Sequence, residues 1–121
     1  MTIKGSCHCG ANRFEIDTAP QSVTRCTCSI CSKKGALWAY YAVDQVRFET
    51  PTSFATYRWQ SKTVAHNFCP TCGCSTYGVS PTWVDFKPDF DHMRLALNAR
   101  LFDDFDLDAV PVEVMDGRNL W

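Results

Sequence analysis

The sequence contains no long apolar run and no apolar segment near its N-terminus. No stretch approaches the roughly 18 apolar residues that a membrane-spanning helix needs, and the first ten residues, MTIKGSCHCG, lack the apolar core of a secretory signal peptide. The chain also lacks a low-complexity linker and a repeat of solenoid length. We therefore expect a single cytoplasmic domain over residues 1–121 with no membrane partner.

The sequence also has little net charge. Its 12 basic and 13 acidic residues give a formal net charge of -1, and the nearest approach to a basic cluster is Lys33–Lys34. Domains that bind nucleic acid or anionic membranes carry basic patches. The charge therefore argues against a nucleic-acid partner, and in particular against a nucleic-acid-binding zinc ribbon.

Cysteine is what the sequence does have. The eight cysteines form three clusters: Cys7 and Cys9; Cys26, Cys28 and Cys31; and Cys69, Cys72 and Cys74. Cysteines that serve only as small apolar core residues scatter along a chain, whereas thiols one or two residues apart are close enough to share a metal ion. A disulfide framework is the alternative interpretation, and a reducing cytosol disfavours it. The clusters therefore predict one or two zinc ions.

Short β-prone segments separated by Gly, Pro, Asn and Asp predict a mainly β, mainly antiparallel fold. Helix is expected in only two places: Ser29–Lys34, which Gly35 ends, and a short turn near Phe102–Leu107. The Leu, Ala and Met residues of 93–99 leave a helix open as an alternative to a strand there. The predicted strands are Arg13–Ile16, Trp38–Val43, Val46–Phe48, Phe54–Trp59, Thr63–Phe68, Ser75–Val79 and Met93–Ala99.

The first and third clusters together predict a closed, structural zinc site. Residues Cys69–Gly73 read C-P-x-C-G, the zinc-knuckle pattern, in which a positive φ at Gly73 aims backbone N–H groups at the sulfurs. Cys7 and Cys9 are expected at the end of the first strand, where side chains two residues apart face the same side. A knuckle and a distant pair supply four thiolates, which is the usual composition of a structural zinc site.

The middle cluster differs because its three cysteines come from one short segment. Cys26, Cys28 and Cys31 are expected to span a strand end and the first turn of a helix, whose N-terminus favours the thiolate form. Three thiolates leave the fourth position of a tetrahedral zinc ion open for water or substrate, as in catalytic zinc sites. The alternative is a second closed site with Cys74 as the fourth ligand. An iron–sulfur or rubredoxin-like site is disfavoured because only one C-x-x-C motif, Cys69–Cys72, has the knuckle form C-P-x-C-G.

Four segments carry a resemblance to a known family: GSCHCGANRFEI, RCTCSICSKKGALWAY, HNFCPTCGCSTYG and DLDAVPVEVMDGRN. Together they resemble the glutathione-dependent formaldehyde-activating enzyme (GFA) family, which includes the centromere protein V type. The resemblance implies an antiparallel β-tent of the Mss4-like kind, with one or two short helical turns and two zinc ions. By the family pattern, the structural ion is held by Cys7, Cys9, Cys69 and Cys72, and the catalytic ion by Cys26, Cys28 and Cys31.

The activity that this resemblance implies is that of a carbon–sulfur lyase, which reversibly joins formaldehyde and glutathione into S-(hydroxymethyl)glutathione. The expected partner is therefore a small thiol or a thiol–aldehyde adduct, with glutathione among the candidates. Zinc suits such chemistry because it can stabilise a substrate thiolate or polarise an aldehyde oxygen. His66 and His92 are candidates for a general base by residue type only. The alternative function is a non-catalytic zinc module that binds another protein through its β surface.

Overall fold

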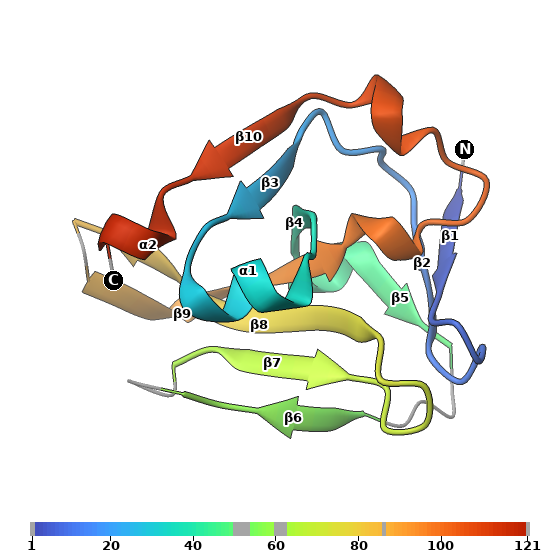
Figure 1. The fold of residues 1–121 in the computed structure, drawn as a ribbon, viewed down its shortest axis with the longest axis horizontal. Helices are drawn as coiled ribbons and strands as arrows, with labels where there is room; N and C mark the ends of the chain where they lie inside the picture. The colour runs from blue at the N-terminus through green and yellow to red at the C-terminus, as the bar shows by residue number, and fades with distance from the viewer. Residues whose placement is uncertain (1, 50–53, 60–62, 86, 121) are drawn as a thin grey trace.

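The strands of the chain form two sheets (Figure 1), in a computed structural model that describes residues 2–49, 54–59, 63–85 and 87–120. The smaller sheet has the strand order β1-β2-β5, and the larger has the order β10-β3-β4-β9-β8-β7-β6. The strands are β1 (Ile3–Ser6), β2 (Arg13–Ile16), β3 (Val23–Cys26), β4 (Trp38–Ala42), β5 (Val46–Phe48), β6 (Ala55–Tyr57), β7 (Ala65–Phe68), β8 (Ser75–Val84), β9 (Lys87–Asn98) and β10 (Val112–Met115).

Helical segments are short. They are α1 (Ser29–Lys34), α2 (Gly117–Leu120) and the 3-10 turns η1 (Val43–Gln45), η2 (Ala99–Leu101) and η3 (Leu107–Ala109). The prediction of a mainly β fold is confirmed, and so is the helix over Ser29–Lys34. Gly35 ends that helix in the left-handed conformation, with φ 67°, and its N–H donates to the Cys31 carbonyl. Glycine adopts this conformation without the steric penalty that a Cβ atom would bring.

Two local predictions hold only in part. A short helical turn was expected near Phe102–Leu107; the 3-10 turn η3 begins at Leu107, but residues 102–106 are not helical. The reason is that Phe102 is buried and pairs with Gly5, while Asp104 takes a positive φ of 52°, which interrupts a helix. Cys7 and Cys9 were expected at the end of the first strand; β1 ends at Ser6, so Cys7 directly follows the strand and Cys9 lies in the turn after it.

The pairing of the large sheet is antiparallel except between β10 and β3, which run parallel. The segment over Met93–Ala99 is strand rather than helix, because β9 pairs with β4 on one side and with β8 on the other. Leu and Ala are tolerated in a central strand whose neighbours cover it. The sheet therefore places the end of β3 beside β4, and β4 beside β9.

The two faces of the large sheet differ in character, because side chains alternate along each strand. One face packs on the hydrophobic core through Ala39, Tyr41, Leu95 and Leu97, which face one another across the β4–β9 pair. The opposite face carries Trp38 and Tyr40 of β4 and Arg94 of β9. This second, more polar face is the one on which the middle cysteine cluster lies.

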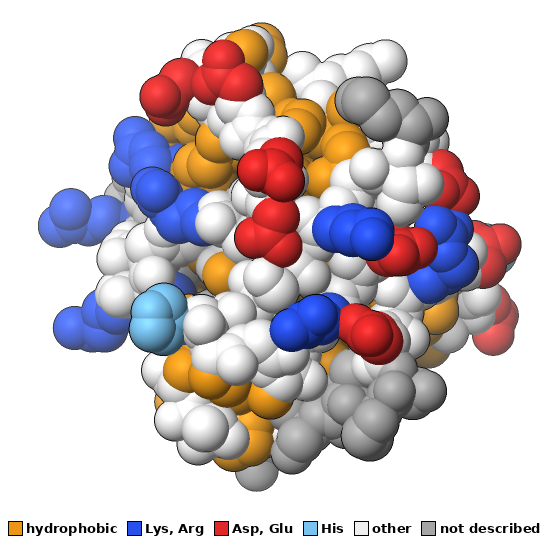
Figure 2. Space-filling model, turned by 90° about the vertical axis from the view of Figure 1, so that its right-hand side faces the viewer, with side chains coloured by type: hydrophobic (Ala, Val, Ile, Leu, Met, Phe, Trp, Pro, Cys, Tyr) orange, Lys and Arg blue, Asp and Glu red, His pale blue; other side chains and the backbone are white. Residues whose placement is uncertain are grey.

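Charges of both signs are mixed on the part of the surface that Figure 2 shows, which lies on the side of β1, β2 and β5. Among the helices of the described residues, none has the length and apolar character needed to cross a bilayer.

Candidate metal centres

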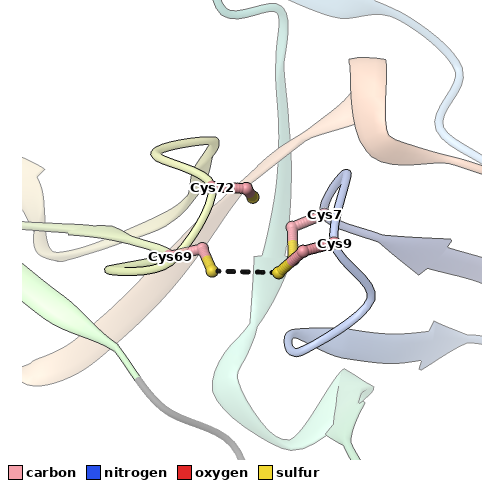
Figure 3. A group of neighbouring side chains, drawn as sticks. All are labelled: Cys7, Cys9, Cys69 and Cys72. Atoms are coloured by element: carbon pink, nitrogen blue, oxygen red, sulfur yellow. Dashed lines mark hydrogen bonds between the residues drawn. The ribbon is translucent and has the colours of Figure 1, made fainter.

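Four cysteines from two distant turns come together at one point of the fold. Cys7 and Cys9 follow β1, and Cys69 and Cys72 follow β7; their four sulfur atoms lie within 4.8 Å of one another (Figure 3). The Sγ–Sγ distance is 3.7 Å between Cys7 and Cys9 and 3.6 Å between Cys9 and Cys69. A tetrahedron of zinc–sulfur bonds of about 2.3 Å has an edge of about 3.8 Å. The four thiols therefore fit the coordination shell of a zinc ion.

Backbone hydrogen bonds shape the turn that carries Cys69 and Cys72. Gly73 has a φ of 82°, and its N–H donates to the Cys69 carbonyl at 2.8 Å. The backbone N–H groups of Cys74 and Cys9 point at the Cys72 sulfur and lower the pKa of this thiol to about 5. The positive φ predicted for Gly73 is confirmed, and the turn favours the thiolate form that a metal ion requires.

Asn12 supports the opposite half of the same site, a role that the sequence analysis missed. Its backbone N–H and its Nδ2 donate to the Cys7 sulfur, at 3.3 Å and 3.8 Å, and its carbonyl accepts from the Cys7 N–H at 3.0 Å. The residue is 2% exposed. In the sequence, Asn12 was interpreted only as a turn residue before the Arg13–Ile16 strand. Its position five residues after Cys7 was the one feature that could have pointed to this contact.

The middle cluster lies where β3 ends and α1 begins, as the sequence predicted. The sulfur atoms of Cys26, Cys28 and Cys31 all lie within 4.8 Å of one another, with Cys26 and Cys28 buried and Cys31 partly exposed. The Cys28 N–H donates to the Cys26 sulfur at 3.5 Å. Burial raises the pKa of Cys28, but the N–H groups of Cys31 and Ile30, with the neighbouring thiols, bring it below its usual value. Three thiolate-forming donors from one segment fit three corners of a zinc site.

Trp38 holds the third cysteine of this cluster. Its Nε1–H donates to the Cys31 sulfur at 3.4 Å, and the indole is 5% exposed. Burial raises the pKa of Cys31 and the Trp38 bond opposes this effect. The sequence predicted only a strand at Trp38–Val43, and this contact with Cys31 was not predicted.

Lys34 lies near the middle cluster, and His66 lies near Lys34. The Lys34 Nζ donates to the Ser75 hydroxyl at 3.4 Å, and the Cys31 charge acts on this ammonium. His66 of β7 is buried, and its burial together with the charge of Lys34 lowers its pKa to about 4. His66 is therefore neutral at pH 7.

The other candidate general base, His92, is in a different environment. Its Nδ1 lies 2.7 Å from the Asp89 carboxylate, and its side chain is 76% exposed on β9. The roles assigned to the two histidines by residue type stay predictions.

Cys74 does not join the middle cluster. The groups that act on its thiol belong to the first site: the His8 N–H, the Cys72 thiol and the Cys7 charge. The metal-holding groups among the described residues contain four cysteines and three cysteines, and Cys74 is in neither. All eight cysteines are free, as expected for metal-binding thiols rather than a disulfide framework.

Comparison with known families shows to which family the chain belongs. The family model described as glutathione-dependent formaldehyde-activating enzyme matches residues 2–89, which include all three cysteine clusters. The chain belongs to the GFA family. The resemblance read from the sequence is thereby confirmed.

Individual proteins that are similar to this chain support its assignment to the GFA family. A protein of Halomonas elongata, whose provisional name is glutathione-dependent formaldehyde-activating enzyme, is 29% identical over 101 residues; the alignment covers 74% of this chain and 64% of the relative. The chain thus spans less than two thirds of that relative's length. A crystal structure of a Rhodobacter sphaeroides protein superposes with a TM-score of 0.70 at 26% identity and covers 91% of this chain and 99% of that one. The fold is therefore shared with a solved structure over nearly its whole length.

Proposed function

We propose that the chain is a zinc-dependent carbon–sulfur lyase of the GFA type with two zinc sites of different roles. Cys7, Cys9, Cys69 and Cys72 would form a closed structural site, because four thiolates complete a tetrahedral shell. The middle cluster, Cys26, Cys28 and Cys31, would form the catalytic site. The proposal treats residues 1–121 as one domain, and a reducing cytosol as the compartment in which eight free thiols hold metal.

The reaction class is the reversible addition of a thiol to a small aldehyde. A carbon–sulfur bond forms between the thiol and the carbonyl carbon, and the thiol proton moves to the former carbonyl oxygen; the reverse reaction breaks that bond and regenerates both partners. Atoms and electrons balance without a further reactant. Zinc would supply an open coordination position and Lewis acidity there. The family name and that of the Halomonas relative support S-(hydroxymethyl)glutathione as the model adduct.

The chain's own residues would hold and orient the reacting groups. The Trp38 N–H and the Cys28 N–H keep the Cys31 and Cys26 sulfurs in place, at 3.4 Å and 3.5 Å. Lys34 brings a positive charge near Cys31, where a substrate thiolate would be stabilised. This support is the outer shell that usually tunes a metal site.

The observation that carries the proposal is the unequal donor count of the two clusters. Four thiols close one site, while three thiols on the polar face of the large sheet leave the other with an open corner. The alternative, a non-catalytic zinc module, needs no such corner.

The test is exchange between glutathione, formaldehyde and their adduct, followed by NMR with the zinc-loaded chain. We expect the exchange rate to increase with the wild-type protein and to return to the uncatalysed rate with Cys31→Ser. No acceleration by fully zinc-loaded wild-type protein would reject the enzymatic proposal and favour the module.

A further inference from the structure

Arg94 is a partly buried arginine that makes no ion pair among the described residues. Its Nε is buried and has no hydrogen-bond partner. Two other arginines show the contrast: Arg47 pairs with Asp17 at 2.7 Å, and Arg100 donates from Nε to the Gly35 carbonyl at 2.7 Å. A buried N–H group that loses water without gaining an acceptor is costly. The arrangement is explained if the missing anion belongs to a ligand.

The position of Arg94 is determined by the aromatic ring beneath it. Its guanidinium carbon lies 4.3 Å from the centre of the Tyr40 ring. Arg94 pairs with Ala42 across the β4–β9 register, so its side chain lies on the same face of the sheet as Tyr40. Stacking on the ring keeps the planar group oriented while leaving its edge available to a carboxylate.

This stack lies next to the middle cysteine cluster. Trp38, which donates to the Cys31 sulfur, is on the same face of β4 as Tyr40, two residues and roughly 7 Å along the strand. The charges of Cys26 and Cys31 also act on the Tyr40 hydroxyl. The polar face therefore presents, in order, the three thiols, the Trp38 indole, the Tyr40 ring and the Arg94 guanidinium.

A surface groove begins at Tyr40 and Arg94 and leads away from the cysteines. Its volume is about 610 Å³. Thr82, His92 and Asp91 also line it. Asp91 is the acidic residue of the groove, and it lies in the irregular part of β9, three residues before Arg94. Arg94 is the arginine at the end of the groove that lies toward the cysteines, beside Tyr40.

We propose that Arg94 is a specificity-determining residue that binds the carboxylate of an anionic thiol substrate. This inference rests on the proposed function, because it takes the cluster of Cys26, Cys28 and Cys31 as the place where the substrate sulfur binds. Trp38 and Tyr40 lie roughly 7 Å apart along β4, the length of about two extended residues, so we take the substrate to be a thiol whose carboxylate lies one or two chain residues from the sulfur. Glutathione belongs to this class, because its glycine carboxylate directly follows its cysteine.

The test compares two ligands that differ only in this carboxylate: glutathione and the analogue whose glycine ends in a carboxamide. Their dissociation constants are measured by calorimetry on the full, zinc-loaded chain. We expect the wild-type protein to prefer the carboxylate about 10- to 100-fold, the range of a charge-assisted hydrogen bond. Arg94→Gln should lose this preference by weakening only the binding of glutathione. Arg94→Met, which keeps an apolar side chain over Tyr40, should lose the preference for the carboxylate in the same way.

Two matched variants serve as controls. Arg25→Gln removes an arginine that alternates with Thr24 and Cys26 on β3 and so faces away from the cluster; it should keep the full preference. Lys34→Gln removes the cation that would stabilise the substrate thiolate; it should weaken the binding of both ligands equally and so keep the preference. Zinc content and circular dichroism confirm that each variant is folded and loaded.

The outcomes separate this inference from the proposed function. Equal binding of the two ligands by the wild-type protein would overturn the role of Arg94 and leave the lyase proposal standing. A preference that survives in both Arg94 variants, or that disappears in Lys34→Gln, would overturn it as well. A preference that depends on Arg94, together with no catalysed exchange, would support the carboxylate site and reject the lyase.

Discussion

Replacing Trp38 by phenylalanine tests whether the middle cluster is a supported metal site. The substitution keeps an aromatic ring in a position that is 5% exposed but removes the N–H that lies 3.4 Å from the Cys31 sulfur. A hydrogen bond to a charged group contributes about 1.5–3 kcal/mol, and loss of an outer-shell partner typically lowers metal affinity 10- to 100-fold. We therefore expect the middle site to bind zinc at least tenfold more weakly, and the four-cysteine site to be unchanged.

The assay is a stepwise zinc competition against a chromophoric chelator, run beside a thermal unfolding curve. Tyr41→Phe is the matched control, because it removes a buried hydrogen bond, from the Tyr41 hydroxyl to the Thr18 carbonyl at 2.9 Å, on the opposite face of β4. It should reduce stability by about 1 kcal/mol and leave both zinc affinities unchanged. The reasoning is refuted if Trp38→Phe reduces stability but not the affinity of the middle site, or if both sites weaken equally.

Three further predictions concern the two sites and their surroundings. Cys72→Ser should abolish cooperative unfolding of the domain, since a structural zinc ion contributes about 10–16 kcal/mol to folding. Cys31→Ser should lose one zinc ion and keep a cooperative unfolding transition. If both variants lose cooperative unfolding, the two sites do not differ in role. Gly73→Ala, at a φ of 82°, should cost about 1–2 kcal/mol and weaken zinc binding at the four-cysteine site, while Gly35→Ala, at a φ of 67°, should reduce stability with no change in that affinity. Because the pKa of His66 is lowered in the folded state, the unfolded chain takes up this proton at a higher pH, so the free energy of unfolding should fall as the pH decreases from 6.5 towards about 4. Chemical denaturation at a series of pH values should show a shallower fall for His66→Gln. An equal dependence of stability on pH in the variant and the wild-type protein would contradict the lowered pKa of His66.

Local chemistry made part of this structure predictable from sequence. Ser29–Lys34 followed by glycine is a short helix with its usual stop, and α1 has those bounds. The knuckle needed a residue that tolerates positive φ, and Gly73 has it. The division of the cysteines also followed from spacing, because only residues within one turn can place three sulfurs together without help from a distant segment.

Features that depend on pairing between distant segments were not predictable in the same way. Asn12 holds the turn after β1, and the Phe102–Gly5 bridge joins β1 to a distant segment; the spacing of Cys7 and Cys9 predicts neither contact. The roles of Trp38 and Arg94 depend on the register between β4 and β9, and a shift of one residue would place either side chain on the core face. The parallel pairing of β10 with β3 likewise joins segments far apart in the chain.

The central claim is that the chain holds two zinc ions in sites that differ in openness. The most direct measurement is zinc per chain in natively purified protein, repeated after mild chelation with and without added glutathione. We predict two zinc ions, of which one is removed readily, is protected by glutathione and is the ion missing from Cys31→Ser. One zinc ion per chain would contradict this claim. So would two zinc ions that the chelator removes together, or two that it fails to remove, whether or not glutathione is present.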